Sequence, residues 1–68
     1  MFLGLHSYFS DEKMIYISID KISDFTDYVP GEEFTGTLVT MENGNKWAVQ
    51  ETPQQIADLI NKAGRINV

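Results

Sequence analysis

The chain has 68 residues and a formal net charge of −5, from ten acidic side chains against five basic ones. With no cysteine and one histidine, disulfides are excluded and a zinc site made only of protein ligands is not expected. Its basic residues are scattered, which disfavours direct binding to nucleic acid or to an anionic membrane, and the length allows one domain, residues 1–68.

The first two segments in chain order have the composition of strands. Residues 2–9 are aromatic and aliphatic on both faces, which predicts a strand at the centre of a sheet. Residues 14–19 alternate Ile15, Ile17 and Ile19 with other side chains, the period of a strand that turns its isoleucines toward the core.

The middle of the chain predicts a third strand and a turn. Residues 22–28 suit a strand with Asp24 and Asp27 facing water, although the spacing of its apolar residues also permits a helical turn. Pro30 and Gly31 then occupy the second and third places of a type II turn.

A hairpin follows. Residues 34–41 and 46–50 are β-like, and Asn43-Gly44 between them is the preferred pair for a type I′ turn, in which both central residues take positive φ. Trp47 and Val49 fall on one face of the second strand.

The last segment predicts a helix. Thr52 is a good N-cap, Pro53 suits the first helical position, and Gln55 completes a capping box. Gly64 suits the C-terminal cap. One apolar face repeats at helical spacing and comprises Ile56, Leu59, Ile60 and Ala63.

These elements predict an α+β fold, with a four- to five-stranded, mostly antiparallel sheet followed by one C-terminal helix packed on one face. The other face still carries aromatic side chains, and a second molecule would cover it. Small domains without disulfides or metals often depend on oligomerisation, so we expect a homo-oligomer.

No catalytic or metal site is expected, and no cofactor. His6 is the only histidine, it lies in a predicted strand, and no cysteine or Gly-x-Ser-x-Gly motif supplies a nucleophile beside it. We therefore interpret His6 as a structural or surface residue and expect the protein not to be an enzyme.

Two kinds of side chain are candidates for partner contact. Aromatic residues are enriched in binding hot spots, which selects Trp47, beside the hairpin tip, and Tyr28. Acidic residues between positions 20 and 33 either form a solvated strand edge that blocks edge pairing or meet a basic protein surface. The acidic candidates are Asp24, Asp27, Glu32 and Glu33.

Residues 39–53 combine a strand, the Asn-Gly hairpin, a strand ending in Val49 and Glu51, and a Thr-capped helix. This run resembles the core of the FlbD-type flagellar and swarming-motility proteins, and similar short proteins occur in phages and prophages. Residues 16–22 are similar to that family's strand-plus-turn segment. The resemblance, from about Met14 to Gly64, implies a small accessory or regulatory protein that acts by contact, and it carries over no catalytic residue.

The leading hypothesis is therefore a self-associating adaptor or accessory protein with a protein partner. One alternative is an acidic, phage-type inhibitor that blocks a basic site on a host or nucleic-acid-binding protein. Another is a small-ligand binder at a subunit interface. The lack of an export signal or a long apolar run predicts a cytoplasmic protein without membrane insertion.

Overall fold

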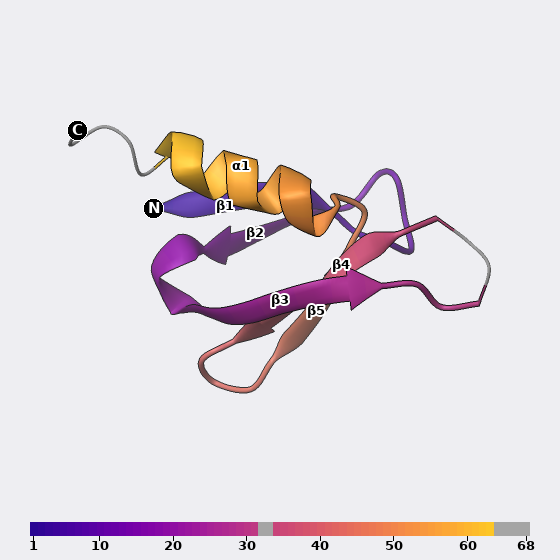
Figure 1. Cartoon of the computed structure of the whole chain (residues 1–68), viewed down its shortest axis with the longest axis horizontal. Coiled ribbons are helices and arrows are strands. Elements are labelled where there is room, and N and C mark those ends of the chain that lie inside the picture. The colour runs from indigo at the N-terminus through magenta and orange to yellow at the C-terminus, as the bar shows by residue number, and fades with distance from the viewer. Residues whose placement is uncertain (32–33, 64–68) are drawn as a thin grey trace.

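A computed structural model describes residues 1–31 and 34–63 of the chain. Figure 1 shows its α+β architecture, which confirms the predicted class, the antiparallel pairing and the C-terminal helix. The elements are β1 (Phe2–His6), β2 (Met14–Ser18), a 3-10 turn (Ile19–Lys21), β3 (Ile22–Tyr28), β4 (Gly36–Met41), β5 (Lys46–Val49) and α1 (Pro53–Ala63).

The strands form two antiparallel sheets, so the prediction of one continuous sheet is wrong. β1 pairs with β2 in the first sheet, and the second has the order β3-β4-β5. The 3-10 turn at Ile19–Lys21 redirects the chain directly after β2, and β3 then pairs with β4 instead of β2. A single bridge between Ser7 and Val49 links the two sheets.

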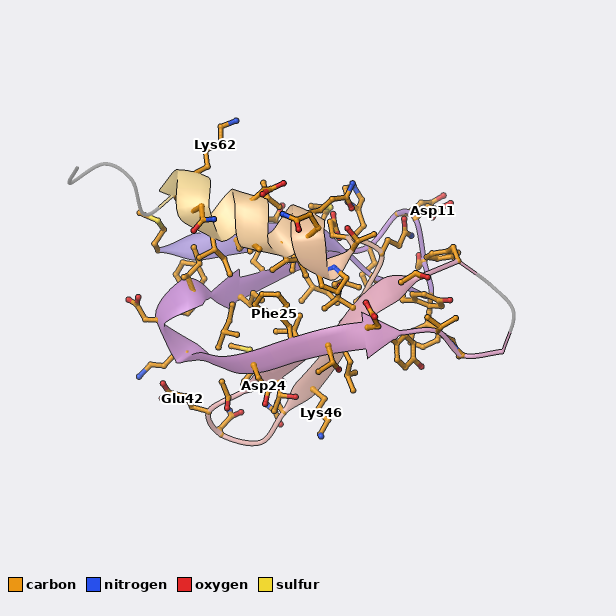
Figure 2. The ribbon with its side chains drawn as sticks, viewed as in Figure 1. Asp11, Asp24, Phe25, Glu42, Lys46 and Lys62 are labelled. Atoms are coloured by element: carbon orange, nitrogen blue, oxygen red, sulfur yellow. The ribbon has the colours of Figure 1, made fainter. Side chains whose placement is uncertain are left out.

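The core lies between the inner faces of the two sheets. It consists of Leu3, Leu5, Ile17, Val39, Met41, Val49 and Ile56. Figure 2 shows Phe25 of β3 pointing toward this interior, where it packs as a half-buried residue against the core. Burying a large aliphatic side chain contributes about 1.5–3 kcal/mol, so each fully buried member of this cluster stabilises the fold by an amount of that order. Both sheets thus contribute to one core, and α1 adds Ile56 and Ile60 to it, so the predicted helix packing holds while the prediction of a single sheet does not.

β1 is shorter than predicted and alternates between exposed and buried residues. Phe2 is 70% exposed, whereas Leu5 is fully buried. Tyr8 and Phe9, which were predicted to belong to the strand, lie in a turn. The strand ends because the Tyr8 backbone N–H donates to the Ala48 carbonyl at 3.0 Å, which draws the chain from β2 to β5.

The β3 segment is a strand, so the alternative of a helical turn is wrong. Asp24 and Asp27 are exposed, as predicted. Gly31 has a φ of 74°, the positive value that the third place of a type II turn requires. Glu32, the fourth residue of that turn, lies outside the described residues.

The β4–β5 hairpin is confirmed, but its turn differs from the type I′ prediction. Gly44 alone takes a positive φ, of 94°, and Asn43 does not. The Gly44 N–H donates to the Met41 carbonyl at 2.9 Å, and the Met41 N–H donates to the Asn45 carbonyl at 2.8 Å, which defines a three-residue loop. Asn43 uses its side chain instead, since its Oδ1 accepts a hydrogen bond from the Asn45 N–H at 3.0 Å.

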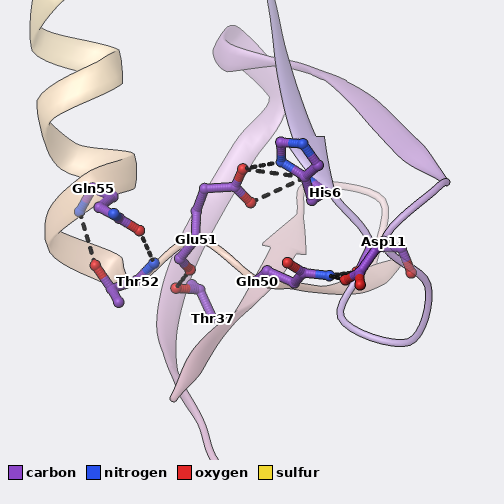
Figure 3. Close-up of polar contacts among 8 residues, drawn as sticks. His6, Asp11, Thr37, Gln50, Glu51, Thr52 and Gln55 are labelled. Carbon is purple, nitrogen blue, oxygen red and sulfur yellow. Dashed lines mark hydrogen bonds and ion pairs between the residues drawn. The ribbon is translucent and has the colours of Figure 1, made fainter. Parts of the chain in front are cut away.

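The capping box of α1 is confirmed. The Thr52 N–H donates to Gln55 Oε1 at 2.9 Å, and the Gln55 N–H donates to Thr52 Oγ1 at 3.2 Å (Figure 3). Ile56 is fully buried and Ile60 packs against the core, but Leu59 is 36% exposed and lies at the margin of the apolar face. Gly64, the predicted C-cap, is outside the described residues. Within the described part of the chain, α1 is too short to span a membrane and no other helix has the length or apolar character to do so.

Candidate interaction surface

A groove of about 620 Å³ opens between β2 and the β4–β5 hairpin. We call it the Trp47 groove. Aromatic and aliphatic side chains share its lining with polar and charged groups from the 3-10 turn and the hairpin loop. The lining residues are Tyr16, Ile17, Ser18, Lys21, Met41, Glu42, Asn43, Asn45 and Trp47. Its size lies within the range of pockets that bind ligands or side chains of a partner.

Trp47 reaches the groove because of its place in the second sheet. Its row across the sheet is Phe25–Val39–Trp47, and the central Val39 is fully buried. Trp47 therefore belongs to the inner face, together with Val49 as predicted, but it stands on β5 at the end of the row. Its side chain is 39% exposed, so part of a large aromatic surface remains open to solvent.

A second apolar area covers the outer face of β1–β2. Tyr16 pairs with Gly4, and a Cβ on Gly4 would lie only 2.9 Å from the Tyr16 ring, so the ring lies over the glycine. Met14 contacts the same position, while Phe2 and Tyr16 are 70% and 68% exposed. These residues were not among the sequence candidates. The signal for them was the period of two in residues 14–18, which places Tyr16 on the face opposite the isoleucines.

The two acidic candidates that the structure describes do not share one face of β3. Asp24 and Asp27 stand three positions apart in a regular stretch of β3, so they belong to opposite faces of the strand. Asp24 shares its row across the sheet with Thr40 and Lys46, and Figure 2 shows Asp24 and Lys46 on the same side of the molecule, away from α1. Glu32 and Glu33 lie outside the described residues.

Tyr28 belongs to a cluster of aromatic rings at the far end of the second sheet. Its ring meets Tyr8 edge-on, with centroids 5.1 Å apart, and Tyr8 stacks on Phe34 at 4.3 Å. The Tyr8 hydroxyl donates to the Phe34 carbonyl at 2.8 Å. Aromatic pairs of this kind stabilise a fold, and Tyr28, half-buried among them, is engaged in packing.

His6 takes part in a polar junction at the corner where β1, β5 and the start of α1 meet (Figure 3). The Glu51 carboxylate lies 2.7 Å from His6 Nδ1 and accepts the His6 backbone N–H at 3.0 Å. Gln50 Nε2 donates to the Ser7 carbonyl and to Asp11 Oδ1, at 2.9 and 2.7 Å. These contacts connect the N-terminal strand to the segment before the helix, and they assign His6 a structural contact.

Thr37 of β4 stabilises this polar junction. It is a fully buried polar residue, and its hydroxyl donates to the Glu51 carbonyl at 2.6 Å. Thr37→Val keeps the shape of the side chain but leaves that carbonyl without its donor, so we expect the free energy of unfolding to fall by about 1–3 kcal/mol. Urea denaturation measures the loss. Thr40→Val, at a half-buried position of the same strand, is the control and should change stability by less than about 0.5 kcal/mol.

Among residues 1–31 and 34–63, no group of three or more histidine, cysteine or acidic side chains is placed to hold a metal ion.

Comparison with known proteins identifies no relative: no family model, no curated protein and no solved structure matches the chain.

Proposed function

We propose that this chain is a non-enzymatic protein-interaction module of the adaptor or accessory class. It binds an extended segment of a protein chain along the edge of β2, with the Trp47 groove receiving side chains of that segment. The resemblance to small motility and prophage proteins supports an accessory role.

One observation carries the proposal: an uncharged strand edge lies beside a groove that contains a half-exposed tryptophan. Proteins that recognise extended peptides commonly add them as a strand to an open sheet edge. Backbone hydrogen bonds then supply affinity, and adjacent pockets select the side chains. Tyr16 and Trp47 have the aromatic chemistry that dominates such contacts.

The acidic-inhibitor alternative has less support. It requires several carboxylates that face one basic surface, whereas Asp24 and Asp27 belong to opposite faces of β3. The two hypotheses differ in salt dependence, because screening weakens binding between exposed charges much more than burial of apolar surface. Binding through the Trp47 groove should persist in high salt.

Photo-crosslinking in the native cell tests the proposal. A photoreactive phenylalanine derivative at position 16 replaces a tyrosine of similar size at the proposed contact, and the same residue at the exposed Thr26 of β3 is the control. We expect a crosslinked protein from position 16 and none from position 26. Equal crosslinking from the two positions, or none from position 16, would overturn the proposal.

Trp47→Ala in the position-16 protein gives the quantitative prediction. Removing an aromatic anchor at the centre of a contact weakens binding by about 2 kcal/mol or more, a factor of roughly 30. We therefore expect the crosslinked product to fall at least about tenfold, while circular dichroism confirms that the variant is folded. A yield that is unchanged by Trp47→Ala would contradict a role for the groove.

A further inference from the structure

The tip of the β4–β5 hairpin exposes an asparagine that is followed by a glycine. Asn43 and Gly44 are both exposed, and Asn43 lines the Trp47 groove. The side-chain amide of an asparagine can be attacked by the backbone nitrogen of the next residue, and a side chain on that residue obstructs the attack. Gly44 has none, and a Cβ at this position would meet nothing within 4 Å. The approach to the Asn43 amide is therefore open.

A hydrogen bond orients the Asn43 side chain for this attack. Its Oδ1 accepts the Asn45 backbone N–H at 3.0 Å, so the side chain folds back over the peptide bonds that follow it. That conformation turns the amide carbon toward the Gly44 nitrogen. The same hydrogen bond withdraws electron density from the amide carbon, which makes the carbon a better electrophile.

A second hydrogen bond acts in the opposite direction. The Gly44 N–H donates to the Met41 carbonyl at 2.9 Å, and the nitrogen must lose this proton before it can attack. The Met41 N–H in turn donates to the Asn45 carbonyl at 2.8 Å and closes the loop. Opening an exposed loop requires much less free energy than unfolding the domain. The folded hairpin thus slows the reaction without preventing it.

We propose that Asn43 is a site of spontaneous deamidation in the folded protein, and that the hairpin sets its rate. The Gly44 nitrogen forms a bond to Asn43 Cγ, the Cγ–Nδ2 bond breaks, and Nδ2 leaves as ammonia with the proton that the Gly44 nitrogen loses. Water then opens the resulting succinimide ring. Opening at Cγ gives aspartate, and opening at the main-chain carbonyl gives isoaspartate. The reaction needs no partner, so it is independent of the proposed function.

Both products change the Trp47 groove. Each adds one carboxylate beside Glu42, which also lines the groove, and takes the formal net charge of the chain from −5 to −6. Isoaspartate also adds a carbon to the main chain of a loop that is closed by backbone hydrogen bonds at both ends. Complementary charge governs which partners approach a surface. The groove therefore becomes more favourable for a basic segment as the protein ages.

The other asparagines of the sequence are less suited to this reaction. Asn45 and Asn61 each precede a lysine, and Asn67 precedes the β-branched Val68. Their neighbours have side chains that obstruct the attack. Asn61 also lies in α1, where hydrogen bonds between successive turns hold the backbone nitrogens. Asn43 should therefore react first.

Mass spectrometry of the purified full-length chain, incubated in mildly alkaline buffer, tests the proposal. Deamidation raises the intact mass by the difference between water and ammonia, and an isoaspartyl methyltransferase labels the isoaspartate product. Asn43→Gln lengthens the side chain, which disfavours ring closure, and should gain mass at least about tenfold more slowly than the wild type. Asn45→Gln is the matched control and should react at the wild-type rate. Circular dichroism checks that both variants are folded.

The same incubation in urea tests the role of the hairpin. The unfolded chain lacks the hydrogen bond from Gly44 to Met41, so it should deamidate at least about tenfold faster than the folded protein. Equal mass gain in Asn43→Gln and the wild type would overturn the assignment of the site. A folded wild type that gains no mass while the unfolded chain converts would also overturn the proposal. Equal rates with and without urea would contradict control by the hairpin.

Discussion

Gly36→Ala is expected to lower the free energy of unfolding by about 3 kcal/mol, a large part of the roughly 5 kcal/mol available to a domain of this size. A Cβ at this position would collide with the backbone carbonyl oxygen of Val49 and would lie 2.7 Å from Tyr8 Cδ2. Neither neighbour can move freely. Val49 is fully buried and bridges Ser7, and Tyr8 is 6% exposed and stacked on Phe34.

Gly4→Ala is the matched control for this prediction, because it adds the same methyl group to a glycine in another strand. There the nearest atom is Tyr16 Cε1, the outer part of an exposed side chain that can rotate away. The loss should stay below about 1 kcal/mol. Urea denaturation of the two variants gives the comparison, and equal losses would show that the close approach at Gly36 does not constrain the fold.

The local elements of this protein were predictable because their signals lie within a few residues of one another. Thr52 and Gln55 form the reciprocal bonds of a capping box, three positions apart. The Asn43-Gly44 pair predicted the position of the hairpin correctly. It did not predict the turn type, because Gly44 takes a positive φ and Asn43 does not. Capping and turn chemistry need no knowledge of the rest of the chain.

The division into two sheets could not be predicted in the same way. Periodicity identifies the buried face of each strand, and it placed Ile17 inward correctly. It does not say which strand lies alongside which. That choice depends on contacts between distant segments, such as the bridge from Ser7 to Val49 and the bond from the Tyr8 N–H to Ala48. Residues 2–9 were assigned to one strand because the diversion at Tyr8 has no local signature.

The candidate surface was predictable in part for a related reason. Trp47 follows a tight hairpin, and this local position indicated an exposed aromatic side chain. Tyr16 becomes a candidate only once β2 is known to have a free edge, which is a property of the sheet order. For the acidic candidates, proximity in sequence does not decide which of them share a surface: the pleat of β3 places Asp24 and Asp27 on opposite faces, and Glu32 and Glu33 lie outside the described residues.

Ile56→Ala is expected to lower the free energy of unfolding by about 3 kcal/mol, within the range measured for aliphatic residues that leave a cavity. Ile56 is fully buried and is the one residue of α1 within the buried core cluster of the described chain, so its removal loosens the packing between the helix and both sheets.

Leu59→Ala tests the same face of the helix one turn later, at an aliphatic residue that is more exposed than Ile56. Sequence periodicity assigned both residues to one apolar face, but Leu59 is 36% exposed, so its truncation should cost less than about 1 kcal/mol. Urea denaturation should give a clear difference between the two variants. Similar losses would mean that α1 is rotated about its axis relative to the sheets, and that Leu59 occupies the core beside Ile56.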